Sequence, residues 1–233
     1  MEIEEYAEIA PQYYDGDMEP LLEKYLAETK WQSLLDCGCG DGGFLFSLYK
    51  RGYARDKAIR AVDFSKSRIE LVKKIDPSIQ AAVDNAEDLA TIPDASVDFL
   101  VSTQVIEHVD DAKMIATLDR VVKDGATLYL STVYKKWYGW YFYRNQKKQW
   151  ALDPTHLREY RCDSELLDKL AKERFTVLEN VKKLQYFPVI DFFVKRLGIK
   201  NRLLYSNRFV RLVRKIRVPI FGYYNWIIVL KKK

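Results

Sequence analysis

The stretch Leu34-Leu35-Asp36-Cys37-Gly38-Cys39-Gly40-Asp41-Gly42-Gly43-Phe44 decides the fold of this chain. Two apolar residues lead into an acid and four glycines, the pattern expected where a buried strand turns into a helix. Because glycine has no Cβ, a backbone rich in glycine at this turn can approach a bound ligand closely. The stretch therefore predicts a strand, a ligand-binding turn and a helix.

A second acid, Asp63, ends the apolar run 58–62, and it follows Gly42 by 21 residues. An acid at the end of a second strand can accept hydrogen bonds from both hydroxyls of a ribose. The two strands together therefore predict a nucleoside ligand.

Two classes of nucleoside fit this pattern. Gly38, Gly40 and Gly43 satisfy the dinucleotide motif G-x-G-x-x-G, which is a weak signal on its own. Asp36, however, lies two residues before the first glycine, where its charge would repel a pyrophosphate. The same acid suits a ligand that carries an ammonium and a sulfonium group. A nicotinamide cofactor is the alternative.

Two further motifs follow in order, Asp84-Asn85-Ala86-Glu87-Asp88-Leu89 and Gln104-Val105-Ile106-Glu107-His108-Val109. With the glycine stretch and Asp63, this series resembles the Rossmann-like S-adenosylmethionine (SAM)-dependent methyltransferases over roughly residues 30–185. The resemblance implies an α/β fold: a doubly wound, mostly parallel seven-stranded sheet with helices on both faces and an antiparallel last strand. It also implies SAM as the cofactor and a small-molecule methyl acceptor.

Local patterns place the elements of such a sheet. Strands are expected at 31–36, 58–63, 79–83, 97–103, 127–132, 175–187 and 223–230. Helices are expected at 19–29, 42–51, from Ser65 onward, at 111–122 with Gly125 ending the helix, and at 164–173. Ligands on such sheets bind outside the carboxyl ends of the strands, where Asp36, Asp63 and Gln104 lie.

The family resemblance assigns the cofactor residues of the first two strands. Asp36 and the backbone of Gly38, Cys39 and Gly40 would hold the amino-acid end of SAM. Asp63 would hold the ribose hydroxyls, and Phe64 would lie beside the adenine. These assignments predict a cofactor site at the glycine turn.

The remaining cofactor residues lie outside that turn. Asn85 with Ala86 would accept a hydrogen bond from the adenine amino group, although Asp84 or an ordinary turn are alternatives at this position. Gln104 is also placed at the cofactor. Tyr14 resembles a family tyrosine that covers the cofactor.

Methyl transfer to a hydroxyl requires a group that removes its proton, and a neutral histidine is the usual choice near pH 7. The chain has two histidines, His108 and His156. We expect one of them to be the base, with His156 favoured and Glu107 beside it. The alternatives are that His108 caps a helix and that His156 stabilises a turn.

The order of Glu107-His108-Val109 and the later stretch 153–160 is most similar to the polyprenyl-hydroxyphenol O-methyltransferases of ubiquinone biosynthesis. In that family the acids and the histidine are associated with a divalent metal. Here Gln104 replaces the first acid, so no metal site is expected. The resemblance implies O-methylation of a hydrophobic phenol, a prenylated ring or a lipid-linked acceptor. A sugar or other polar metabolite is an alternative acceptor, and a SAM-binding protein without catalysis is a further alternative.

One domain is expected over residues 1–233, with an N-terminal helical cap at 1–30 and an aromatic insert at 134–160. The insert would form a lid over a hydrophobic acceptor, or contact anionic headgroups, or pack as a helix over the sheet edge.

A basic amphipathic helical insertion is expected at 190–220, with one helix over 202–217. Residues 192–233 hold 12 Lys/Arg and no acid, whereas the rest of the chain holds 26 basic and 33 acidic residues. This asymmetry predicts contact of residues 192–220 with an anionic membrane surface. A helix docked on the core is the alternative, and nucleic acid is disfavoured because no RNA-binding module accompanies the charges.

Three features predict the compartment. The three cysteines lack the spacing of a disulfide framework, residues 1–8 carry four glutamates, and no run of 18 apolar residues occurs. We therefore expect a cytoplasmic protein that is peripheral at the membrane.

Overall fold

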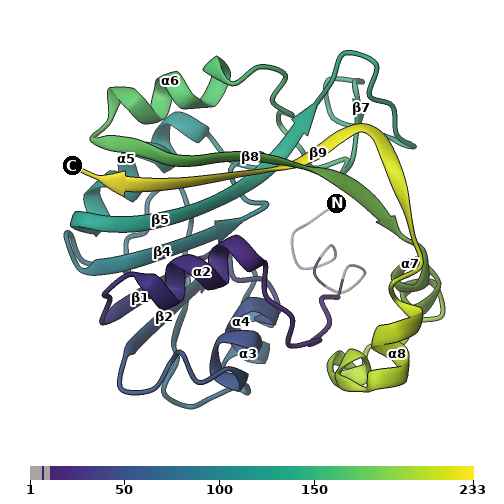
Figure 1. Cartoon of the computed structure of the whole chain (residues 1–233), viewed down its shortest axis with the longest axis horizontal. Coiled ribbons are helices and arrows are strands. Elements are labelled where there is room, and N and C mark those ends of the chain that lie inside the picture. The colour runs from purple at the N-terminus through teal and green to yellow at the C-terminus, as the bar shows by residue number, and fades with distance from the viewer. Residues whose placement is uncertain (1–6, 8–10) are drawn as a thin grey trace. The chain divides into compact units, whose positions relative to one another are not determined.

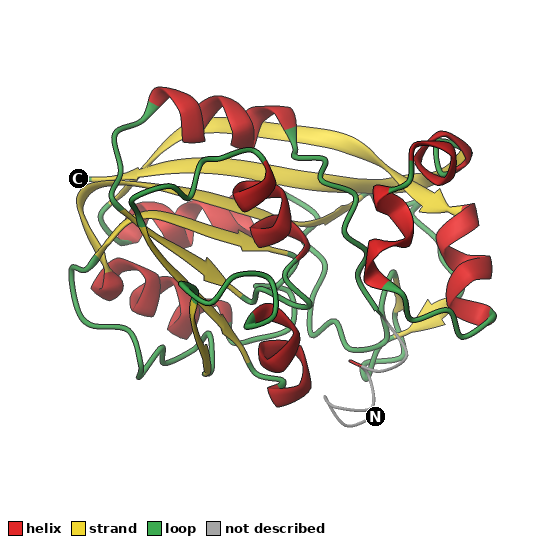
Figure 2. Cartoon of the chain, turned by 90° about the horizontal axis from the view of Figure 1, so that it is seen from below, coloured by secondary structure: helices red, strands yellow, loops and turns green. Residues whose placement is uncertain are grey.

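The computed structural model describes residue 7 and residues 11–233. Helices and strands alternate through the first part of the chain (Figures 1 and 2). They are α2 (Pro20–Glu28), β1 (Ser33–Cys37), α3 (Gly43–Lys50), β2 (Ala58–Asp63), α4 (Lys66–Val72), β3 (Gln80–Val83), β4 (Val97–Thr103), α5 (Asp111–Val121) and β5 (Val122–Lys135). The second part holds β6 (Tyr143–Arg144), β7 (Trp150–Ala151), α6 (Ser164–Lys172), β8 (Phe175–Pro188), α7 (Val189–Arg196), the 3-10 helix η1 (Arg202–Ser206), α8 (Arg208–Val213) and β9 (Arg217–Lys232).

Seven strands form a sheet in the order β3-β2-β1-β4-β5-β9-β8. The pairs β1–β2, β2–β3 and β4–β5 are parallel, whereas β9 runs antiparallel to β5. The last strand, β9, thus lies between β5 and β8. The prediction of a mostly parallel, doubly wound sheet with an antiparallel last strand is confirmed.

The described residues group into two compact units. The first unit runs up to Asp84 and includes residues 187–218, and the second unit comprises 85–186 and 219–233. Segment 187–218 thus belongs with the N-terminal strands β1, β2 and β3, although it follows them late in the sequence.

The cores of both units are built from the strands. All five residues of β1 are buried, and in β4 the side chains of Phe99, Leu100 and Val101 are fully buried. Such continuous apolar runs are expected in parallel strands, because neighbouring elements cover both faces.

Gly125 does not end helix α5, which is a correction to the sequence analysis. The helix ends at Val121 with Val122 as its C-cap, and β5 begins there. Gly125 lies within β5 with a φ of 77°, beside a register shift opposite Val97 and Phe99. The glycine therefore serves the bulged start of a strand, where a left-handed backbone is needed.

The helix expected over 202–217 is also wrong as a single element. The 3-10 helix η1 and helix α8 divide it, and the side chain of Asn207 caps α8 by accepting from the amides of Phe209 and Val210. An asparagine at this position competes with helix continuation, because its side chain binds the backbone locally.

The aromatic insert contains a short antiparallel hairpin, β6 with β7, and not a packed helix. It is joined to β9 by a hydrogen bond from the amide of Lys136 to the carbonyl of Gly222, 2.8 Å long. A Cβ on Gly222 would lie 2.5 Å from the Cα of Gly139, so this close approach requires glycine. Within the described part of the chain, no helix is long and apolar enough to cross a membrane.

Candidate cofactor and acceptor sites

The glycine turn of the first unit joins β1 to α3 and is fastened to the end of β2. The amides of Gly38 and Cys39 donate to the carbonyl of Val62 at 2.8 and 2.9 Å. Gly40 has a φ of 54°, and a Cβ there would lie 2.4 Å from Nε2 of Gln12. A larger residue at Gly40 would be strained because its φ is positive, whereas the Gln12 side chain could move aside.

Asp63 positions this turn from the end of β2. Its Oδ2 accepts from the amide of Gly40 at 2.9 Å, and its Oδ1 accepts from the amide of Ser65 at 2.9 Å. Each carboxylate oxygen can accept more than one hydrogen bond. Asp63 can therefore hold the turn and still receive the hydroxyls of a ribose.

Asp36 is a buried carboxyl whose Oδ2 has no hydrogen-bond partner among the described residues. It is 2% exposed, and burial, followed by the charge of Asp63, raises its pKa to about 8. A charge buried without a partner is costly, and a cation placed beside it would remove that cost. The site therefore fits a ligand with an ammonium group, such as the amino-acid end of SAM.

Asp41 anchors the opposite side of the turn, a role that the sequence analysis missed. It is fully buried and forms an ion pair of 2.9 Å with Nε of Arg202, while Nε of Arg68 lies 3.5 Å away. Its Oδ2 accepts from the amide of Gln12 at 2.9 Å, and its carbonyl accepts from the hydroxyl of Tyr14 at 2.5 Å. The glycine turn is thus held by residues from three separate parts of the sequence.

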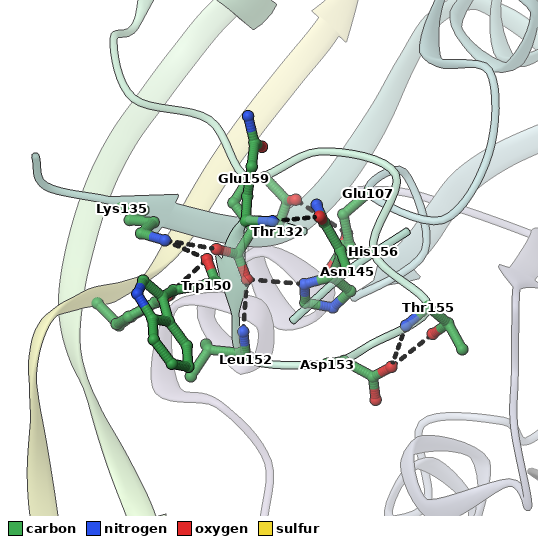
Figure 3. Close-up of polar contacts among 12 residues, drawn as sticks. Glu107, Thr132, Lys135, Asn145, Trp150, Leu152, Asp153, Thr155, His156 and Glu159 are labelled. Atoms are coloured by element: carbon green, nitrogen blue, oxygen red, sulfur yellow. Dashed lines mark hydrogen bonds and ion pairs between the residues drawn. The ribbon is translucent and has the colours of Figure 1, made fainter. Parts of the chain in front are cut away.

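The second unit contains a separate cluster around Glu107 (Figure 3), on the loop between β4 and α5. Glu107 is fully buried, and its Oε2 accepts from the hydroxyl of Thr132 at 2.9 Å. Burial raises the pKa of Glu107 to about 7, although the charge of His156 opposes the shift. This carboxyl therefore holds its proton more readily than an exposed glutamate does.

His156 lies in the same cluster and is paired with Glu159. The imidazole is 4% exposed, and its Nδ1 lies 2.9 Å from Oε1 of Glu159 (Figure 3). Burial lowers the pKa of His156, but the hydrogen bond to Glu159 and the nearby carboxylates outweigh it and raise the pKa above 6.5. In the neutral ring Nδ1–H donates to Glu159, which leaves Nε2 as a proton acceptor. The sequence analysis gave Glu159 no role, although it lies in the stretch 153–160.

His108 contacts His156 but makes different polar contacts. The two ring centroids are 4.8 Å apart with planes 74° from parallel, and Nδ1 of His108 lies 3.0 Å from the hydroxyl oxygen of Thr155. The N-cap of α5 is Asp110, whose carboxylate accepts from the amides of the first turn. The alternative that His108 caps this helix is therefore wrong.

The stretch 153–160 holds the Glu107 loop in place. The carbonyl of Glu107 accepts from the amide of Leu157 at 2.9 Å, and the guanidinium of Arg158 donates to the carbonyls of Ile106, at 3.0 Å, and Val109. The hydroxyl of Tyr160 donates to Oδ2 of Asp111 at 3.0 Å. Through these hydrogen bonds the stretch holds the loop that carries Glu107 and His108 in position.

Glu107, His108 and His156 each offer one ligand atom, and these atoms lie within 4.8 Å of one another. The same three groups could thus surround a divalent cation. Gln104 supplies no carboxylate, because it is an amide whose Nε2 donates to Oδ1 of Asn225 at 3.2 Å. The absence of a metal stays a prediction.

Residues 35–130 match the family model of the methyltransferase domain. The chain is thus similar in this segment to methyltransferases, and its sheet has the Rossmann-like methyltransferase fold. SAM is the cofactor that such proteins use, and the buried Asp36, whose Oδ2 lacks a hydrogen-bond partner among the described residues, fits that cofactor.

Two curated relatives of this chain match it over part of their length. A probable SAM-dependent methyltransferase of Mycolicibacterium smegmatis is 29% identical over 71% of this chain and 60% of that protein. A ubiquinone biosynthesis O-methyltransferase of Neisseria meningitidis serogroup C is 26% identical over 58% of this chain and 62% of that protein. The chain thus spans about 60% of the length of these two relatives.

Solved structures share the fold of this chain. The PH0226 protein of Pyrococcus horikoshii OT3 has a TM-score of 0.62 at 16% identity, covering 100% of both chains. The geranyl diphosphate C-methyltransferase of Streptomyces coelicolor has a TM-score of 0.59 at 15% identity, covering 91% of this chain and 78% of that one.

The other predicted cofactor residues have varied surroundings. In the first unit Phe64 is exposed, and Tyr14 is buried with its ring stacked 4.9 Å from that of Phe46. In the second unit Oδ1 of Asn85 accepts from the amide of Glu87 at 3.0 Å, which forms a turn beside the half-buried Ala86. Gln104 is exposed with a φ of 56°. Their roles at the cofactor stay predictions.

Arg202→Ala is expected to loosen the glycine turn. Removing one partner of a buried ion pair costs about 3 kcal/mol, because Asp41 is left with weaker compensation. We expect the free energy of unfolding to fall by about this amount and the affinity for S-adenosylhomocysteine to fall with it. Urea denaturation and calorimetric titration would measure both, with the exposed Arg208→Ala as the matched control. Equal affinities in the two variants would contradict the role of Arg202.

Proposed function

We propose that this protein transfers a methyl group from SAM to a hydroxyl oxygen of a hydrophobic acceptor, such as a phenol, a prenylated ring or a lipid-linked compound. The observation that carries the proposal is the buried pair of His156 and Glu159, with Glu107 beside it. A histidine held through Nδ1 by a carboxylate is suited to remove a proton at Nε2.

The proposal gives separate tasks to the cofactor and to four side chains. SAM supplies an electrophilic methyl group on a sulfonium when bound. Asp36 would hold the ammonium group and Asp63 the ribose. His156 would take the hydroxyl proton, and Glu159 would stabilise the imidazolium that results.

The hydrophobic nature of the acceptor is supported by the aromatic insert. Trp137 is 89% exposed, and Trp140, Phe142 and Tyr143 are exposed beside it, among several lysines. Amphipathic rings and lysines of this kind are typical of surfaces that meet lipid. We propose that the two units form one methyltransferase domain that meets a lipid-borne acceptor peripherally at a membrane.

The proposal is tested by measuring S-adenosylhomocysteine formation from SAM with a panel of acceptors. Hydroxybenzenes with and without a prenyl chain are compared with sugars, and we expect turnover to rise with prenyl length. Turnover confined to sugars would overturn the hydrophobic acceptor, and SAM binding without turnover on any acceptor would favour a non-catalytic protein. A parallel assay with EDTA tests whether the cluster of Glu107, His108 and His156 needs a metal ion. If the cluster acts by proton transfer, activity should remain when divalent cations are removed.

A further inference from the structure

Segment 187–218, here called the C-terminal insertion, is fastened to the first unit by three arginines. Arg202 pairs with Asp41, Arg211 pairs with Asp17, and Arg214 pairs with Asp15 and with Asp191, the last at 3.1 Å. In each pair the acid belongs to the same unit as the arginine. The three arginines are thus used within the protein, which differs from the uninterrupted basic helix face that the sequence analysis expected.

An aromatic contact completes this attachment. Tyr205 is fully buried with its ring 4.4 Å from that of Tyr13, and the guanidinium of Arg214 lies 4.6 Å above the ring of Tyr205. The hydroxyl of Tyr13 donates to the carbonyl of Ile199 at 2.8 Å. The C-terminal insertion is therefore attached to the first unit by ion pairs, ring contacts and a hydrogen bond.

Those remaining side chains include an unusual number of exposed apolar groups. Leu197 is 74% exposed, Phe209 is 72% exposed and Leu212 is 61% exposed, and Phe193, Leu203 and Ile216 are exposed as well. Large apolar side chains at this density on one short segment mark an interaction surface, because exposing them to water is unfavourable.

The exposed charges of the C-terminal insertion are all positive. They are Lys195, Arg196, Lys200, Arg208, Lys215 and Arg217. The insertion contains one acid, Asp191, and it is buried against Arg214. The exposed side chains of the insertion therefore combine cations with apolar groups.

We propose that the C-terminal insertion is a docking surface for a lipid bilayer with anionic headgroups. At such a bilayer the phenylalanine and leucine side chains enter the boundary of the acyl region while lysine and arginine pair with headgroups. A nucleic acid would satisfy the cations but not the aliphatic side chains, and a protein interface core is depleted in lysine. The proposal concerns binding alone, so it stands or falls separately from methyl transfer.

The test is flotation of the full chain with vesicles. We expect the protein to float with vesicles of phosphatidylcholine containing 30% phosphatidylglycerol, and not with phosphatidylcholine alone. Arg208→Glu combined with Lys215→Glu is expected to weaken binding at least about tenfold, because each cation near an anionic surface contributes about fivefold. The double variant Phe209→Ser with Leu212→Ser tests whether the exposed apolar side chains contribute to vesicle binding. Both side chains are exposed, so their replacement should preserve folding.

The matched control is Arg55→Glu combined with Lys74→Glu, which makes the same change of charge at exposed positions of the same unit. It should float like the unchanged protein, and S-adenosylhomocysteine binding should show that every variant is folded. Failure to float, or equal loss in the control, would overturn the proposal. Tighter binding to RNA than to vesicles would also overturn the proposal. The same holds if the protein is a dimer in solution and the variant Phe209→Ser with Leu212→Ser is a monomer.

Discussion

Asp36→Asn is expected to weaken the affinity for S-adenosylhomocysteine by about tenfold to a hundredfold while raising the thermal stability of the protein at pH 8. Hydrogen bonds to charged groups contribute about 1.5–3 kcal/mol, which corresponds to that loss of affinity. Stability rises because the amide has nearly the same shape as the carboxyl but carries no charge that burial would penalise. Calorimetric titration and thermal unfolding measure the two effects. Asp88→Asn, at an exposed acid, is the control and should change neither.

The same residue predicts a dependence on pH whose sign can be worked out. The pKa of Asp36 is raised to about 8 in the folded protein from an ordinary value of 3.8, so the folded state binds this proton more tightly than the unfolded state does. This contribution to stability is therefore full below about pH 4 and is lost as the pH rises toward 8. In Asp36→Asn that loss should vanish.

Ligand binding should also release a proton from Asp36. A ligand ammonium favours the ionised carboxylate, so at pH 7 the site must give up its proton when S-adenosylhomocysteine binds. Titrations in phosphate and in Tris, which differ in ionisation enthalpy, would report the release. An identical proton release in the wild-type protein and in Asp36→Asn would contradict this account of the site.

His156→Ala is expected to lower kcat by about a hundredfold to ten-thousandfold, the range for loss of a general base. His108→Ala should cost much less, because Nδ1 of His108 already contacts the hydroxyl of Thr155 and its ring lies beside the proposed base. Turnover is measured as S-adenosylhomocysteine formation with the best acceptor of the panel. If His156→Ala kept normal turnover while His108→Ala lost it, the roles of the two histidines would be reversed.

Glu159→Gln separates positioning from proton transfer. The amide can still accept a hydrogen bond from Nδ1 of His156, but the loss of its charge lowers the pKa of the imidazole. The rate should rise with pH as the neutral base forms, with a midpoint above 6.5 in the wild-type protein and a lower midpoint in Glu159→Gln. If the midpoint of the pH–rate profile does not move but the rate falls, Glu159 supports the folded structure and does not set the pKa of His156.

Parts of the fold could be predicted from sequence because the responsible interactions are local or periodic. The strands at 58–63 and 97–103 have the predicted bounds, since buried parallel strands give short apolar runs with polar residues at their ends. Ser65 caps α4 as expected, because an N-cap depends on one side chain and the amide of Arg68 three residues later.

Other features depend on partners that are distant in the sequence. The same arginines that give 202–217 its helical charge pattern are paired with Asp15, Asp17 and Asp41 near the start of the chain. Charge periodicity alone cannot distinguish such paired arginines from solvated ones. The role of Glu159 was missed for a similar reason, since only the folded turn brings its carboxylate to the ring of His156.

The position of β9 in the sheet has a consequence for the biosynthesis of this protein. β9 lies between β5 and β8. The edges of β5 and β8 that pair with β9 therefore stay unpaired until residues 217–232 have left the ribosome. Until then their unpaired edges and the apolar side chains of β5 are open to other chains. The second unit therefore cannot complete its sheet before residues 217–232 have been synthesised.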